Sequence, residues 1–374
     1  RPSPSQHRST AEEQTEADCL EGFQHPRHTN ELFGHDSAEA LLCEAVANGR
    51  LHHGWLITGD TGIGKSTLAW RFVRYLLAAP SERAAAARGL DVAADTQASR
   101  QVRALSHPGL LLLRRPYNQK DKRFAASIPI DEVRRLRNFL SHSAAAGAWR
   151  AVIVDTADEL NINAANALLK SLEEPPPRTV FLLVSSEPGR LLATIRSRCR
   201  TLQLAPLQRE PLRRAVRQAL SSSEIGEPDP SQWLTLERLA HGSVRSVLGL
   251  QSAGGLDLYE RVVALITTLP AVDWTLVHAL GDELGGNAAE QRFELFYQLL
   301  LDLVARLIRS AATGTGPDDE QVLANKLIGS QRLATFAELW ERVARAKTDT
   351  LALNLDRKAL ILETMRDLEA AARS

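Results

Sequence analysis

The chain has 374 residues, of which 45 are Lys or Arg and 45 are Asp or Glu, and 44% are hydrophobic. Such a composition is typical of a globular protein of two or three domains. It excludes extensive disorder and a protein that coats a polyanion through its net charge. The three cysteines (Cys19, Cys43 and Cys199) are too few and too widely spaced for a disulfide framework or a four-cysteine zinc site. No apolar run is long enough to cross a membrane, so we expect a cytoplasmic protein with no membrane partner.

The first 24 residues differ in composition from the rest of the chain. They are polar, show no periodicity and contain few side chains that a core could bury. Such segments cannot offset the entropy lost on ordering. We therefore expect a disordered leader over residues 1–24 and a folded domain from residue 25.

Between residues 25 and 204, short apolar runs alternate with stretches of helical periodicity. The runs predicted to be strands are 54–58, 109–113, 150–155, 179–184 and 200–204. The expected helices are 38–46, 67–77, 163–172 and one that Asp131 caps and that runs to residue 140. Because the strands are continuously apolar, the pattern predicts an α/β domain whose parallel sheet has helices on both faces.

No strand is predicted after residue 204. Three short helices are expected over 207–222, 231–240 and 243–252, and they define a small domain over 205–255. Residues 256–374 are helical throughout, with a flexible break at 313–317. An apolar stripe in this part indicates a helix face that packs in a core, and its members are Phe293, Phe296, Leu300, Leu303 and Leu307.

The segment after the first predicted strand fits the phosphate-binding pattern G-x-x-x-x-G-K-[ST]. In this pattern the glycines let backbone N–H groups surround a phosphate, Lys65 reaches the β- and γ-phosphates, and Ser66 binds Mg²⁺. We expect ATP or ADP with Mg²⁺ as the cofactor, although an ordinary strand-to-helix turn is the alternative. The expected nucleotide-binding residues of the loop are Gly59, Asp60, Thr61, Gly62, Ile63, Gly64, Lys65, Ser66 and Thr67.

A metal-binding carboxylate is expected at the end of a neighbouring strand, and Asp155 follows Val152-Ile153-Val154. The next position, where a water-activating Glu would lie, is Thr156, whose hydroxyl cannot accept a proton from water near neutral pH. We therefore expect this chain to hydrolyse ATP weakly or not at all. Ser185 and Ser186 end the fourth strand, where they could sense the γ-phosphate or serve only as turn residues.

Three further segments resemble the clamp-loader branch of the AAA+ ATPases. They are Asn166-Ala167-Leu168-Leu169-Lys170-Ser171-Leu172-Glu173-Glu174-Pro175-Pro176, Ser185-Ser186-Glu187-Pro188 and Ile195-Arg196-Ser197-Arg198-Cys199, which holds a Ser-Arg-Cys motif. The resemblance covers residues 25–255, with weaker marks beyond. It implies an AAA+ P-loop domain with a parallel sheet over 25–204, a small helical lid over 205–255 and an all-α collar, which mediates oligomerisation, over 256–374.

The resemblance also assigns roles to two arginines. It implies that Arg198 is an arginine finger that projects into the site of a neighbouring motor subunit, where a planar guanidinium would neutralise charge on the γ-phosphoryl group. Without the resemblance, Arg198 could equally belong to a solvated basic surface. Arg245 lies in a segment that matches the family's sensor 2, which implies a place over this chain's own phosphates. Pro26 and Phe33 match the segment that frames the adenine.

The expected partners follow from the resemblance: gamma/tau-type motor subunits, a delta subunit, the sliding clamp and, through the assembly, primed DNA. Thr156 favours a non-motor subunit, and the lack of Cys in residues 78–108 implies that the zinc module of many relatives is missing, so no zinc is expected. The alternatives are a gamma/tau-type motor ATPase and a stand-alone AAA+ nucleotide switch. A helical basic face made of Arg134, Arg135 and Arg137 could contact DNA or be plain solvated surface.

Overall fold

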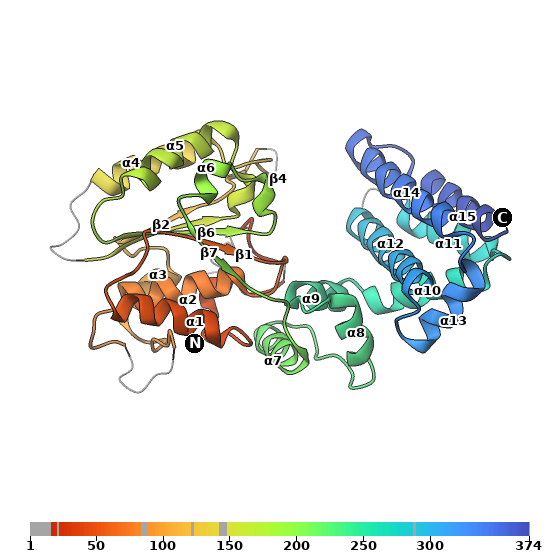
Figure 1. The fold of residues 1–374 in the computed structure, drawn as a ribbon, viewed down its shortest axis with the longest axis horizontal. Coiled ribbons are helices and arrows are strands. Elements are labelled where there is room, and N and C mark those ends of the chain that lie inside the picture. The colour runs from red at the N-terminus through yellow and green to blue at the C-terminus, as the bar shows by residue number, and fades with distance from the viewer. Residues whose placement is uncertain are drawn as a thin grey trace, which may run out of the picture. The chain divides into compact units, whose positions relative to one another are not determined.

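The computed structural model describes residues 16–20, 22–83, 89–120, 123–141, 148–286 and 289–373. The chain divides into two compact units, the first ending at Leu248 and the second beginning at Gly249. The first unit is built on a β-sheet and the second is entirely helical in its described part (Figure 1). The division falls inside α9 (Val244–Ser252), near the boundary predicted at residue 255.

The first unit contains a five-stranded parallel sheet, as the sequence predicts, in the order β2-β5-β6-β1-β7. Its strands are β1 (Gly54–Thr58), β2 (Leu110–Leu113), β5 (Arg150–Asp155), β6 (Thr179–Ser185) and β7 (Arg200–Gln203). The central strand β6 pairs with both β1 and β5, so that Leu182 lies opposite Trp55 on one side and Ile153 on the other. All five apolar runs are therefore confirmed as neighbouring parallel strands.

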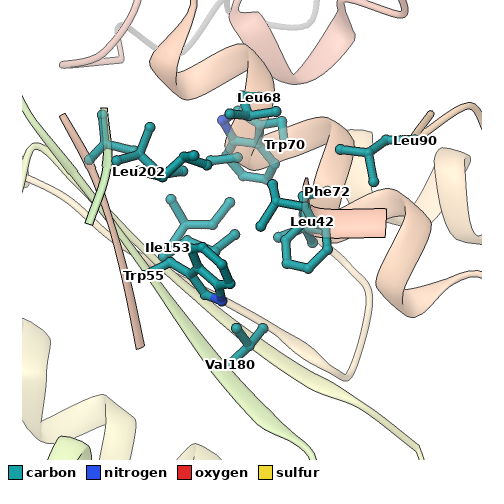
Figure 2. Close-up of a cluster of buried hydrophobic side chains, with 14 of the residues drawn as sticks. Leu42, Trp55, Leu68, Trp70, Phe72, Leu90, Ile153, Val180 and Leu202 are labelled. Carbon is teal, nitrogen blue, oxygen red and sulfur yellow. The ribbon is translucent and has the colours of Figure 1, made fainter. Parts of the chain in front are cut away.

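Helices cover both faces of this sheet (Figure 1). One face carries α1 (Asp36–Ala47), α2 (Lys65–Leu77) and α3 (Gln97–Arg103), and the other carries α4 (Ile130–Ser141), α5 (Ile162–Glu173) and α6 (Ala193–Arg196). Successive strand residues point to opposite faces, so Trp55 and Ile57 pack on the α2 side and Leu56 on the other. Figure 2 shows the cluster on the α2 side, in which the side chains of Trp55, Trp70 and Phe72 are fully buried.

Several features of this unit differ from the sequence prediction, including a hairpin, the start of α4 and the two unpredicted helices α3 and α6. A two-stranded hairpin, β3 (Tyr117–Asn118) and β4 (Arg123–Phe124), is too short to give an alternating pattern. Asp131 does not cap α4, because the helix begins at Ile130 and Asp131 lies in its first turn, where it pairs with Arg134. The first-turn position still places a carboxylate where the helix dipole favours one.

The predicted disordered leader is wrong for its described part. Glu16 and Asp18 have side chains only 8% and 4% exposed, and both form ion pairs with Arg114. A short 3-10 helix, η1 (Pro26–His28), follows this segment. Residues 1–15 and residue 21 of the predicted leader lie outside the described residues.

Three short helices follow the sheet, as predicted: α7 (Arg209–Leu220), α8 (Trp233–Ala240) and α9. Each turns an apolar stripe inward, with Leu212, Val216 and Leu220 buried on α7 and Leu236 and Leu239 on α8. The chain enters this region directly from β7, so the three helices lie close to the sheet in sequence.

The second unit consists of helices in its described residues: α10 (Gly255–Thr268), α11 (Trp274–Leu284), α12 (Glu290–Thr313), α13 (Asp318–Leu327), α14 (Leu333–Leu353) and α15 (Arg357–Arg373). The predicted apolar stripe lies on α12 and is buried over its whole length, which confirms it as core. The predicted break at 313–317 separates α12 from α13, and Gly314 ends α12 with φ 68°. None of the helices in the described part of the chain is long and apolar enough to span a bilayer.

Candidate nucleotide-binding site

The loop between β1 and α2 has a backbone that only glycine accommodates easily. Gly59, Gly62 and Gly64 have φ values of 138°, 79° and 108°. A Cβ atom on Gly62 would lie 2.4 Å from the Cβ of Arg245, so the loop also needs glycine for space. Gly64 immediately precedes α2, which places the positive end of that helix, at Lys65, next to the loop.

A cavity of about 470 Å³ lies over this loop. One part of its wall is polar and contains residues 61–67, Asp155, Ser186 and Arg245. Another part is apolar and includes Pro26, Leu32, Phe33, Leu207, Ala215 and Leu248. A cavity of this size with one polar and one apolar end suits a small molecule that has both an anionic and a flat apolar part.

Lys65 is held at the polar end by the loop itself. Its Nζ donates hydrogen bonds to the carbonyls of Gly59 (2.7 Å) and Asp60 (2.6 Å) and to the Ser186 hydroxyl (3.0 Å). Burial lowers the pKa of Lys65 to about 8, although the negative charges of Asp155, Asp158 and Asp60 favour the charged form. The ammonium group is thus partly desolvated and fixed beside the cavity.

Asp155 ends β5 and is 4% exposed. The Ser66 hydroxyl hydrogen-bonds to its carboxylate, whereas Oδ2 is buried and has no hydrogen-bond partner among the described residues. Burial and, to a smaller extent, the nearby Asp18 carboxylate raise the pKa of Asp155 to about 7, although Ser66 and Lys65 act in the opposite direction. A buried carboxylate oxygen without a donor, next to a hydroxyl group, fits the oxygen ligands of a Mg²⁺ ion that also binds phosphate.

The position after Asp155 is occupied by Thr156, which lines the cavity. Two carboxylates that the sequence places in the following turn also reach the cavity. Asp158 accepts a hydrogen bond from the Ser186 N–H (3.2 Å), and Glu159 pairs with Arg115 (2.7 Å). They lie in η2 (Ala157–Glu159), which turns back toward the sheet edge.

Of the two serines at the end of β6, only Ser186 faces the cavity. Its hydroxyl accepts hydrogen bonds from Lys65 and from the Thr61 hydroxyl (3.1 Å). Ser185 is fully buried, and its hydroxyl has no partner among the described residues. A sensing role for Ser185 is therefore not compatible with its position, whereas Ser186 is in place for one.

The segment that carries Arg245 contacts the phosphate loop directly. The Val244 N–H donates to the Gly62 carbonyl (2.9 Å), and the Ser243 hydroxyl donates to the Thr61 carbonyl (2.8 Å). Arg245 follows at the start of α9 and lines the cavity. The structure thus brings residues 61–67, Asp155, Ser186 and Arg245 to one cavity.

Comparisons with known proteins agree with this arrangement. A family described as DNA polymerase III, delta subunit, matches residues 34–208. The DNA polymerase III subunit delta' (delta-prime) of Escherichia coli is 33% identical over 71% of this chain and 73% of its own length. The chain belongs to the delta-prime family of DNA polymerase III subunits.

Two other relatives show how much of each chain the similarity covers. The delta-prime subunit of Pseudomonas aeruginosa is 38% identical over 45% of this chain and 48% of its own length, so the match spans about half of that relative. The DNA polymerase III subunit tau of Salmonella typhimurium is 26% identical over 78% of this chain and 45% of its own length. This delta-prime family member combines a five-stranded parallel sheet with a phosphate loop in its first unit and helices throughout the described part of its second unit.

Arg198 lies outside the cavity of this delta-prime family member. It precedes β7, at the amino edge of the parallel sheet, whereas the phosphate loop follows the carboxyl end of β1. The five residues of β1 separate the two edges by roughly 13 Å. The Arg198 guanidinium is partly exposed, pairs with Glu173 (2.8 Å) and donates to the Thr194 carbonyl (3.0 Å). Arg198 therefore cannot reach phosphates bound in its own loop.

The predicted basic face on α4 is largely paired within the helix. Arg134 pairs with Asp131 and Arg135 with Glu132, each at 2.6 Å and three residues apart. Exposed pairs of this kind contribute little to stability and leave a nearly neutral surface. The structure therefore favours plain solvated surface over a dedicated DNA contact for these two arginines.

Sequence reasoning missed one wall of the cavity. Ala17, Asp18, Leu20, Phe23 and Gln24 line it, although they lie in the segment predicted to be a disordered leader. Aligned apolar positions are absent there, so periodicity carries no signal for this wall. The described residues also contain no cluster of three or more His, Cys, Asp or Glu side chains that could hold a metal ion; whether zinc is absent stays a prediction.

Proposed function

We propose that this chain is the non-motor, delta-prime-type subunit of a replicative clamp loader. It would bind ATP or ADP with Mg²⁺ in the cavity over residues 59–67, hydrolyse it weakly or not at all, and present Arg198 to the ATP of a neighbouring gamma/tau-type motor subunit. With those subunits and delta it would help to load the sliding clamp onto primed DNA in an ATP-dependent step. Tau and delta-prime subunits among its relatives support these partners.

The observation that carries the proposal is the separation of the two functional groups on one sheet. The carboxyl edge has a complete phosphate loop and Asp155 but Thr156 in place of a strand-end Glu, which fits binding better than turnover. The amino edge presents Arg198, a guanidinium that can serve only a nucleotide bound by another chain. In the proposed assembly Mg²⁺, held through Ser66 and Asp155, would offset phosphate charge.

The finger is tested in a loader reconstituted from this chain, the motor subunit and delta. Arg198→Ala is expected to lower DNA-stimulated ATP hydrolysis by about 10³-fold or more at the one motor site that Arg198 serves. The total hydrolysis rate of the loader would then fall by the contribution of that one site. Arg198→Lys is expected to restore little, because ammonium lacks the planar fork. Arg196→Ala, an exposed arginine two residues away, is the matched control. Unchanged hydrolysis in Arg198→Ala would refute the finger.

A motor subunit of gamma/tau type is the second candidate, and one observation favours it. Asp158 and Glu159 line the cavity, so carboxylates are present near the phosphate end even without a strand-end Glu. This candidate predicts steady ATP turnover by the isolated chain that is lost in both Lys65→Ala and Asp158→Asn. The non-motor proposal predicts nucleotide binding, weakened about 100-fold in Lys65→Ala, without such turnover.

Assembly is tested by native mass measurement of this chain mixed with the motor subunit and delta. A mixed complex that contains all three chains is the expected result. If this chain stays alone at concentrations where the other two associate, the clamp-loader role is wrong and a stand-alone nucleotide switch takes its place.

A further inference from the structure

A segment at the start of the described chain is fixed to the sheet by one arginine. We call residues 16–20 and 22–24 the N-terminal strap. Arg114, which directly follows β2, donates from Nη1 to Asp18 Oδ1 and from Nη2 to Glu16 Oε1, both at 2.8 Å. The two strap carboxylates are almost fully buried, so this contact holds two charges away from water.

The remaining oxygens of both carboxylates are satisfied as well. His25 lies 2.7 Å from Asp18 Oδ2, and Arg27 pairs with Glu16 Oε2. Burial by itself would raise the pKa of Glu16 and of Asp18, but the hydrogen bonds and charges of Arg114, His25 and Arg27 outweigh it, so both pKa values are lowered. A network with all four oxygens paired has a single preferred geometry.

The strap forms a wall of the candidate nucleotide cavity and does not fill it. Its residues line the same cavity as residues 61–67, and about 470 Å³ remains open with the strap in place. Leu20 and Phe23 give this wall an apolar surface. A ligand between the strap and the loop would therefore contact the strap, and opening of the strap would remove one wall of its site.

We propose that Arg114 is a positioning residue that latches the N-terminal strap over the nucleotide cavity and thereby sets how fast nucleotide leaves. The inference rests on the proposed function, since it takes a nucleotide as the occupant of the cavity. Arg114 makes its contacts from the carboxyl end of β2, beside the strand that carries Asp155, so the latch is anchored on the rigid sheet. Without Arg114, the two buried carboxylates lose the ion pairs that offset the loss of their hydration, and this favours an open strap.

Dissociation of a fluorescent ADP analogue from the full chain, chased with excess ADP, measures the proposed effect. Arg114→Met is expected to speed release by about tenfold or more, with a smaller change in the association rate. Arg114→Lys, which keeps the charge, is expected to restore part of the slow release. Glu16→Gln with Asp18→Asn is expected to speed release, and adding Arg114→Met to that pair is expected to have little further effect, because all three belong to one network. Arg134→Met, which removes an exposed arginine on α4, is the matched control.

A second readout needs no nucleotide. Cys19 lies within the strap, where its Sγ donates to the Phe23 carbonyl, and Cys43 lies on α1, outside it. Peptide mapping after alkylation is expected to show faster modification of Cys19 in Arg114→Met and an unchanged rate at Cys43. If wild-type chain binds no nucleotide, the proposed function fails, and the alkylation rates alone decide whether the latch exists.

The latch is refuted if Arg114→Met changes neither the release rate nor the alkylation of Cys19. It is also refuted if Arg134→Met speeds release as much as Arg114→Met does. If Arg114→Met lowers the melting temperature so far that binding cannot be measured, two other variants give the same comparison. These are Arg114→Lys and the double variant Glu16→Gln with Asp18→Asn, whose side chains have nearly the same shape as the originals.

Discussion

The charged side chains at the two edges of the parallel sheet differ in burial and in the number of their contacts. At the carboxyl edge Lys65 and Asp155 are buried and have shifted pKa values, and Lys65 is fixed by two carbonyls of the loop and by the Ser186 hydroxyl. At the amino edge Arg198 is partly exposed and has one ion pair and one backbone contact. The contrast agrees with the proposed roles, because binding of a small anion would need desolvated, fixed groups, whereas a group that acts on a neighbouring chain would have to remain at the surface.

Glycine substitutions at the two edges are expected to give the largest difference in the free energy of unfolding. Gly62→Ala combines φ 79° with a Cβ 2.4 Å from Arg245 Cβ, so we expect the free energy of unfolding to fall by about 3 kcal/mol. Gly54→Ala at the amino edge meets Cys199 Sγ at 3.2 Å and is expected to cost about 1 kcal/mol. Denaturant unfolding measures both, with Gly226→Ala, which meets nothing within 4 Å, as control. Equal losses for Gly62→Ala and Gly54→Ala would contradict the contrast.

Removing a cation from each edge separates binding within the chain from action on a neighbour. Lys65→Ala is expected to weaken binding of a fluorescent ATP analogue about 100-fold, because charge-assisted hydrogen bonds to phosphate are lost. Arg198→Ala is expected to leave this affinity unchanged, since Arg198 lies at the other edge. An affinity loss in Arg198→Ala similar to that in Lys65→Ala would show that Arg198 acts in its own site.

The raised pKa of Asp155 makes the carboxyl edge pH-sensitive. Its folded-state pKa of about 7 exceeds the unfolded value of 3.8, so the folded state binds the extra proton between these pH values. Without nucleotide and Mg²⁺, this group makes the folded state less stable as pH rises from 4 to 7, by up to about 1.4 kcal/mol per pH unit. Asp155→Asn is therefore expected to gain stability over wild type at pH 8 and little at pH 4 in urea unfolding. Asp131→Asn, on the surface of α4, serves as control; a gain for Asp155→Asn that is independent of pH would contradict the assignment.

Substitutions of the two serines at the end of β6 are expected to give the smallest effects. One is expected to weaken nucleotide binding and the other to increase stability. Ser186→Ala removes a hydroxyl that contacts Lys65 and is expected to weaken nucleotide binding by a factor of about 3. Ser185→Ala removes a buried hydroxyl without a described partner, so it should leave binding intact and stabilise the fold by about 1 kcal/mol. Calorimetric titration and thermal unfolding of both variants would show whether the roles are reversed.

Features that depend on residues adjacent in the chain could be predicted from the sequence. Continuous apolar runs identify four of the five strands, all except β7, and the spacing of Gly59, Gly62, Gly64 and Lys65 identifies the loop. Both signals depend on local backbone geometry. The alternation along β6 could not separate Ser185 from Ser186, since the strand is buried on both faces.

Features that depend on distant partners could not be predicted. Glu16 and Asp18 resemble solvated acids in the sequence, and the contacts that make their burial favourable include Arg114, which lies close to a hundred residues further along the chain. Asp158 reaches the cavity because a 3-10 turn reverses the chain after β5, and no periodicity signals such a turn. The two-residue strands of the β3–β4 hairpin are likewise shorter than any alternation that could identify them.

The position of Lys65 makes phosphate binding an exchange reaction. Its ammonium group already has the carbonyls of Gly59 and Asp60 as acceptors, so a ligand gains only the difference between phosphate oxygens and these carbonyls. A nucleoside offers no oxygen able to compete for them and would leave the lysine where it is. In the proposed site, discrimination between nucleosides and nucleotides would therefore be built into the loop before any ligand arrives.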